Sequence, residues 1–149
     1  MGRIPVLCDL DGVVWLAHEP IPGSVEAIAA LRGAGHRVVF VTNNSFSTVA
    51  EQEATLVSIG VPARGDVITS AMAGASLVSE GESVLVCGGP GVVEAVGSVG
   101  ARVVGHDEYE RDEPLVDAVM VGFHRNFDYE IMRRAARAVR RRRGRRAAS

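Results

Sequence analysis

Two aspartates, two residues apart, follow an apolar segment near the N-terminus, and they constrain the fold more than any other part of the sequence. Residues 4–8 are apolar and predict a short buried strand. Asp9 and Asp11 come directly after this strand and are followed by Gly12. The strand would therefore deliver two carboxylates to its C-terminal end, which is where parallel α/β sheets bind ligands.

The paired carboxylates have two interpretations. Side chains at positions i and i+2 point the same way along an extended segment, so Asp9 and Asp11 would lie side by side. Like charges held together repel each other unless a cation or a proton relieves them, which favours a metal or acid–base site. Asp and Gly also favour turns, so a plain turn after a strand is the alternative.

A second predicted strand ends in small polar residues. Residues 38–41 are apolar and lead into Thr-Asn-Asn-Ser at residues 42–45. Hydroxyl and amide groups, together with the backbone N–H groups of a turn into a helix, suit an anion such as phosphate. Ser45 or Ser47 is also expected to cap the following helix, and one turn can serve both purposes.

The segments 9–15 and 42–45 together resemble the first two motifs of the haloacid dehalogenase superfamily of phosphohydrolases. The branch that the sequence resembles most is the 4-nitrophenylphosphatase and sugar-phosphatase subfamily, in which a large α/β cap is inserted after the second motif. Further segments that fit this branch are 22–24, 66–70, 121–123 and 127–130. The resemblance extends over roughly residues 4–140.

This resemblance implies a magnesium-dependent phosphatase of small phosphorylated metabolites. Asp9 would attack phosphorus and form an aspartyl phosphate, while Asp11 would protonate the leaving group and then deprotonate the attacking water. Mg²⁺ would be held by the Asp9 carboxylate and the Asp11 backbone carbonyl, because hard oxygen ligands suit this ion. The residues implied to bind the phosphate are Gly12, Thr42, Asn43 and Asn44.

Two later motifs of the family are not matched. The family pattern requires a lysine that pairs with the nucleophile and an acidic residue that completes the metal site, whereas all 16 basic residues here are arginine. Asp66 precedes its strand and would face the wrong end of the sheet, and Asp107, Asp112 and Asp117 are interpreted as solvating a linker. We therefore expect the N-terminal part of such an enzyme, with little activity. The alternative is a non-catalytic remnant that binds phosphate or polyanions weakly.

The predicted fold class is α/β. The expected domains are the first half of a Rossmann-like core over residues 1–80, the beginning of an inserted α/β cap over 81–139, and an arginine-rich, non-native or disordered tail over 140–149. The expected strands are 4–8, 37–42, 67–69, 83–87, 101–104 and 117–122, and the expected helices are 24–33, 47–59, 70–79, 92–99 and 128–140, the last one capped by Asp128. Residues 88–91, Gly-Gly-Pro-Gly, lack the spacing of a nucleotide-binding loop and predict a tight strand-to-helix turn.

The charge distribution separates an acidic body from a basic tail. Residues 1–132 contain 7 basic and 18 acidic residues, whereas 9 arginines lie in the final 17 residues. The tail is either a nucleic-acid arm, which would neutralise phosphates, or the out-of-frame end of a longer gene. We favour the second interpretation because the family pattern stops there, and we expect no specific nucleic-acid partner.

Composition limits the remaining classes of protein to which the chain could belong. No apolar run approaches the roughly 20 residues of a membrane span and no signal peptide is visible, so we expect a cytoplasmic protein without a membrane partner. Cys8 and Cys87 are interpreted as buried apolar residues rather than a disulfide or metal pair. Trp15 is expected to pack the segment after the nucleophile, with substrate stacking as the alternative. A homo-oligomer formed through the cap is compatible with the resemblance.

Overall fold

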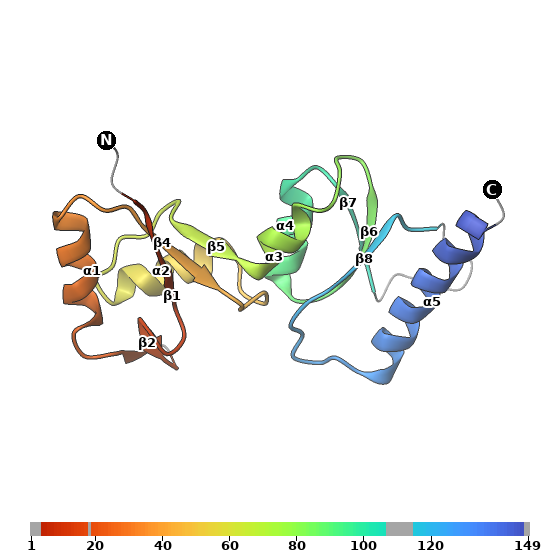
Figure 1. The fold of residues 1–149 in the computed structure, drawn as a ribbon. Helices are drawn as coiled ribbons and strands as arrows, with labels where there is room; N and C mark the ends of the chain where they lie inside the picture. The colour runs from red at the N-terminus through yellow and green to blue at the C-terminus, as the bar shows by residue number, and fades with distance from the viewer. Residues whose placement is uncertain (1–3, 18, 107–114, 148–149) are drawn as a thin grey trace. The chain divides into compact units, whose positions relative to one another are not determined.

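The computed structural model describes residues 4–17, 19–106 and 115–147. The chain divides into two compact units, of which the first comprises Met1–Asn43 and Ser47–Ser70 and the second Asn44–Phe46 and Ala71–Ser149. Each unit contains a three-stranded parallel sheet with helices packed on it (Figure 1). The predicted α/β class is confirmed.

The sheet of the first unit is covered by helices on one face. Its strands, in spatial order, are β1 (Val6–Asp9), β4 (Val38–Thr42) and β5 (Val67–Thr69), and its helices are α1 (Ser24–Gly33) and α2 (Val49–Ser58). Each connection advances in the same direction along the sheet, and right-handed crossovers then place both helices on the same side. Ile28 of α1, Phe40 of β4 and Leu56 of α2 accordingly share one buried core.

The opposite face of this sheet is only partly buried. Leu7 of β1 is 68% exposed and Ile68 of β5 is 44% exposed, while on β4 Val39 beside Leu7 is buried and Val41 beside Ile68 is half-buried. Parallel sheets usually have both faces covered, because their strands are apolar on both sides. The first unit therefore presents an apolar surface on the side away from its helices.

A short hairpin follows β1. Strands β2 (Trp15–Leu16) and β3 (Glu19–Pro20) pair antiparallel, and we call residues 10–20 the flap. Three flap residues, Leu10, Val14 and Trp15, are buried in the core of this unit. This confirms that Trp15 packs the segment after β1, because a ring with 1% of its surface exposed has no open face for a substrate.

The sheet of the second unit is covered on both faces. Its strands, in spatial order, are β7 (Arg102–Gly105), β6 (Ser83–Cys87) and β8 (Ala118–Val121), and its helices are α3 (Ser70–Ala75), α4 (Pro90–Ser98) and α5 (Tyr129–Ala147). Val84 and Val86 of β6 pack with α3 and α4, whereas Leu85 and Cys87 pack with α5. The five residues of β6 are all buried as a result.

The largest differences from the sequence expectation lie at three boundaries. The units divide at Ser70 rather than near residue 80, because Ala71 and Ala75 of α3 pack against β6 of the second unit. Helix α3 ends at Ala75 instead of residue 79. Helix α5 continues through the arginine run to Ala147, beyond the expected end at residue 140; arginine is among the better helix-forming residues.

The structure tests the expected helix caps and the expected glycine-rich turn. Neither Ser45 nor Ser47 caps α2. Its N-cap is Thr48, whose hydroxyl accepts from the Glu51 N–H while the Glu51 carboxylate accepts from the Thr48 N–H. The expected cap at Asp128 is confirmed by a 2.8 Å hydrogen bond from the Ile131 N–H. The expected tight strand-to-helix turn is present and consists of residues 88–89, since β6 ends at Cys87 and α4 begins at Pro90, two residues earlier than expected.

Asp117 has a structural role instead of solvating a linker. Its Oδ2 atom accepts hydrogen bonds from both the N–H and the hydroxyl of buried Ser83, at 2.9 and 2.8 Å. These bonds join the start of β6 to the residue before β8. Asp107 and Asp112 lie outside the described residues.

Among the described residues, no helix combines the length and apolar character needed to cross a membrane.

We expect Asp117→Ala to lower the free energy of unfolding by about 1–3 kcal/mol, because two donors of Ser83 lose their acceptor in a buried setting. Asp117→Asn keeps an acceptor oxygen of the same shape and is the matched control, with a smaller loss. Urea unfolding followed by circular dichroism measures both. Equal stability of Asp117→Ala and the wild type would contradict this role.

We expect Leu7→Thr to reduce self-association while leaving the unfolding midpoint nearly unchanged, because Leu7 is exposed and threonine suits a strand. Val38→Thr is the control, since Val38 is buried and its substitution should destabilise the core. Sedimentation velocity over a concentration series measures the association. Unchanged association in Leu7→Thr would show that this sheet face is not adhesive.

Candidate active site at the carboxyl ends of β1 and β4

Asp9 is the last residue of β1, and its carboxylate is exposed at the end of the strand. The register pairs Asp9 with Val41, so β1 ends beside the last residues of β4. Oδ1 of Asp9 accepts a 2.8 Å hydrogen bond from the Leu10 N–H. This bond holds one oxygen of an otherwise exposed carboxylate.

Asp11 lies in the flap, two residues after the end of β1, and its carboxylate is also exposed. Its Oδ1 atom accepts a 3.0 Å hydrogen bond from the indole N–H of Trp15. The Gly12 N–H donates to the Trp15 carbonyl at 2.7 Å, and this hydrogen bond closes the loop formed by residues 12–15. Gly12 has φ of +82°, a left-handed conformation that favours glycine.

Thr42 is the last residue of β4 and Asn43 follows it, and both belong to the same unit as the two aspartates. The Thr42 side chain is buried, while Asn43 is exposed and its carbonyl accepts a 2.9 Å hydrogen bond from the Ser70 hydroxyl. Because β1 and β4 are parallel, Asp9 and Thr42 lie at the same edge of the sheet.

Asn44 belongs to the second unit together with Ser45 and Phe46. Its Oδ1 atom accepts a 3.0 Å hydrogen bond from the Phe46 N–H. The Ser45 hydroxyl accepts from the Phe123 N–H at 2.8 Å, and the Phe46 ring meets the Phe123 ring edge-on. The predicted phosphate motif is therefore divided, with Thr42 and Asn43 in one unit and Asn44 in the other.

Asp66 lies at the N-terminal end of β5, away from the two aspartates, as the sequence predicts. It forms salt bridges with Arg37 at 3.0 Å and Arg32 at 3.4 Å. These contacts join α1 and the start of β4 to the residue before β5. Asp66 thus stabilises the opposite edge of the sheet.

Both cysteine thiols are held in their protonated form. Burial, and to a smaller extent the charge of Asp9, raises the pKa of the Cys8 thiol. Burial raises the pKa of the Cys87 thiol to about 11. Cys87 is fully buried as expected, and Cys8 is half-buried. A protonated thiol is a poor nucleophile, and the exposed side chain at the end of β1 is the carboxylate of Asp9.

A metal ion at this edge would meet oxygen ligands. Asp9 and Asp11 place two carboxylates at the end of β1 and in the loop that follows it, and within the described part of the chain no three acidic, histidine or cysteine side chains form a metal-binding cluster. Mg²⁺ commonly binds through one or two carboxylates and keeps several waters or substrate phosphates. The donor set is compatible with that type of site.

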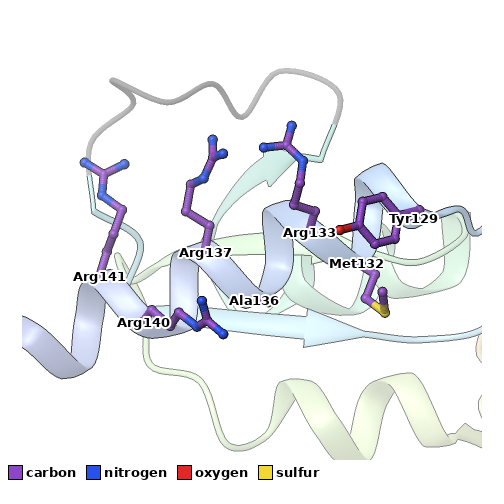
Figure 2. A pocket seen from close by; sticks show the side chains of 7 residues that line it. All are labelled: Tyr129, Met132, Arg133, Ala136, Arg137, Arg140 and Arg141. Atoms are coloured by element: carbon purple, nitrogen blue, oxygen red, sulfur yellow. The ribbon is translucent and has the colours of Figure 1, made fainter.

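A second feature, on α5, is a groove of about 450 Å³ with a basic lining. The residues that line it are Tyr129, Met132, Arg133, Ala136, Arg137, Arg140 and Arg141. Figure 2 shows the guanidinium groups of Arg133, Arg137 and Arg141 extending from the same side of the helix. Arg133 also donates to Glu130 at 3.0 Å, and this hydrogen bond lowers the pKa of the Glu130 carboxyl. The groove suits a negatively charged ligand.

Comparison with known proteins identifies relatives of one kind. A family profile described as haloacid dehalogenase-like hydrolase matches residues 6–102. D-glycerol 3-phosphate phosphatase of Mycobacterium tuberculosis is 35% identical over 91% of this chain and 37% of its own length. Acid sugar phosphatase of Staphylococcus saprophyticus is 33% identical over 90% of this chain and 51% of its own length.

A solved structure supports the same comparison. The structure of a glycerol phosphate phosphatase from Mycobacterium tuberculosis in complex with magnesium superposes with a TM-score of 0.76. It is 33% identical and covers 91% of this chain, which corresponds to 40% of that protein. The chain thus spans 37–51% of the length of these relatives.

We expect the α5 groove to bind oligonucleotides through their phosphates, with equal affinity for unrelated sequences and with loss of binding as salt rises. The logarithm of the association constant falls linearly with the logarithm of the salt concentration, with a slope of about 0.7 per phosphate contact for single strands. The double variant Arg137→Gln/Arg140→Gln removes two such contacts and should reduce the magnitude of this slope by about 1.4. Arg64→Gln, an exposed arginine of the other unit, is the control. A large preference for one sequence would contradict this prediction.

Proposed function

Because the chain belongs to the haloacid dehalogenase-like hydrolase family, we propose that it acts as a phosphatase of small phosphorylated metabolites, with sugar phosphates and glycerol phosphates as its substrate class. The observation that carries the proposal is the position of Asp9. It is an exposed carboxylate at the carboxyl end of a parallel strand, beside the polar end of the neighbouring strand. The names of the two curated relatives support the substrate class.

In this proposal Asp9 is the nucleophile. A hydrogen bond from the Leu10 N–H holds its Oδ1 atom, so Oδ2 can approach phosphorus from a fixed direction. The P–O bond to the leaving group breaks as the bond to Oδ2 forms, which gives an aspartyl phosphate. Water then attacks that phosphorus and releases inorganic phosphate, restoring the carboxylate.

Asp11 is the proposed general acid and base. It would give a proton to the departing oxygen in the first step and take one from the attacking water in the second. Its exposed position in the flap, two residues beyond the nucleophile, supports this role. Two carboxylates with different hydrogen-bond partners can divide nucleophilic and acid–base work between them.

The phosphate would be bound by the hydroxyl of Thr42 and the backbone N–H of Asn43, with Asn44 as a further candidate. Gly12 would contribute space instead of a donor, because its N–H already binds the Trp15 carbonyl. A Cβ atom added at Gly12 would meet nothing within 4 Å, so the loop is open on that side.

Mg²⁺ is the proposed cofactor, held by the Asp9 carboxylate and the Asp11 backbone carbonyl. When bound, it would neutralise charge on the transferring phosphoryl group. The magnesium complex of the Mycobacterium tuberculosis protein supports this choice of ion.

A second candidate function is polyanion binding without turnover. The basic groove of α5 favours it, because several guanidinium groups line one surface. The two functions are separable by substitution, since the groove belongs to the second unit and Asp9 to the first.

We expect Asp9→Asn to abolish Mg²⁺-dependent hydrolysis of 4-nitrophenyl phosphate, because an amide is a far poorer nucleophile than a carboxylate. Steady-state release of 4-nitrophenolate, with and without EDTA, measures this. Glu26→Gln is the control, since it removes an exposed carboxylate of α1 and should leave the rate unchanged. Hydrolysis that persists in Asp9→Asn would exclude the aspartyl-phosphate mechanism for this chain.

A further inference from the structure

The one tryptophan of the chain is in contact with a carboxylate at the candidate site. Trp15, a flap residue, is 99% buried in the core of the first unit, and its indole N–H donates to Oδ1 of Asp11 at 3.0 Å. An indole N–H can only donate, and a buried one requires an acceptor. Here that acceptor belongs to an exposed acid on the proposed reaction path.

The backbone of the flap fixes the donor in place. The Trp15 N–H binds the Leu10 carbonyl at 3.2 Å, and the Trp15 carbonyl accepts from the Gly12 N–H at 2.7 Å. Trp15 also pairs with Pro20 in the hairpin. Asp11, by contrast, is an exposed side chain on a short loop, and an exposed carboxylate without such a partner would sample several rotamers.

We propose that Trp15 is a positioning residue that holds the Asp11 carboxyl group by Oδ1 and thereby makes Oδ2 the oxygen that carries the reacting proton. This inference rests on the proposed phosphatase function and assigns a new role within it. In the acid form, Oδ1 is the carbonyl oxygen that accepts the indole N–H, and the proton resides on Oδ2.

The proton balance is simple. The Oδ2–H of Asp11 passes to the leaving oxygen as its bond to phosphorus breaks, and Oδ2 later takes a proton from the attacking water. The indole keeps its own proton throughout. A fixed donor at Oδ1 therefore leaves one orientation for transfer, and general acid–base catalysis depends on such alignment.

The first measurement tests the contact itself and needs no turnover. In the ¹⁵N-labelled full chain, the single indole N–H gives one assigned resonance. We expect that resonance to shift upfield in Asp11→Ala, because its acceptor is lost, and to stay in place in the control Glu19→Gln, which removes a neighbouring exposed carboxylate of β3. An indole resonance that does not move in Asp11→Ala overturns the proposal.

The second measurement tests the consequence for catalysis. Trp15 is replaced by 3-benzothienylalanine, which keeps the bicyclic shape and substitutes sulfur for the N–H, and 5-fluorotryptophan serves as the conservative variant that keeps the donor. Glycerol 3-phosphate needs a proton on its alkoxide leaving group, whereas 4-nitrophenyl phosphate needs little help. We expect kcat for glycerol 3-phosphate to fall about tenfold or more relative to 4-nitrophenyl phosphate, with KM unchanged and rescue by 5-fluorotryptophan.

The outcomes are distinct. An equal loss for both substrates would indicate a packing role only and would overturn the proposal. If the wild-type chain shows no turnover that depends on Asp9, the proposed function is contradicted. The acid–base role of the contact between Trp15 and Asp11 is then contradicted as well, even if the indole resonance shifts in Asp11→Ala. A selective loss with the alkyl phosphate, together with a shifted indole resonance, supports both.

Discussion

The parallel pairing of β1 with β4 is the constraint on which the candidate site depends. Its register sets Asp9 opposite Val41 and brings the ends of both strands to one edge of the sheet. Phe40, completely buried above α1 and α2, anchors β4 in that register. A slip of one residue would turn Asp9 toward the helices and bring Cys8 to the open face, because side chains alternate along a strand.

The flap converts this edge into a site with two different carboxylates. Asp9 is held by the backbone N–H that follows it, while Asp11 is held by a side chain that comes from the core. Trp15 therefore serves two purposes, since its ring belongs to the hydrophobic cluster and its N–H donates to an exposed carboxylate. The position of Asp11 is consequently coupled to the packing of the first unit.

The two units use parallel sheets with different coverage, and connection order explains the difference. In the first unit every crossover advances the same way, so both helices fall on one face and Leu7 and Ile68 stay exposed. In the second, the chain returns past β6 to form β8, and α5 covers the face that α4 does not. Family membership agrees with this architecture, and the chain spans about half, or less, of the lengths of the curated relatives described above.

The sequence by itself determined the α/β class, the family, most elements and the placement of Asp9 and Thr42 at strand ends, because apolar runs followed by small polar residues are local signals. Tertiary structure decided the contacts that join distant residues. The Asp117 carboxylate accepts a hydrogen bond from Ser83, 34 positions away. The Ser45 hydroxyl accepts one from the Phe123 N–H, 78 positions away, instead of capping a helix. Trp15 could be read as a packing residue, but its hydrogen bond to Asp11 depends on how the flap folds back on the core. Local patterns carry no information on which acceptor a buried donor will meet, and only the packed chain brings the two together.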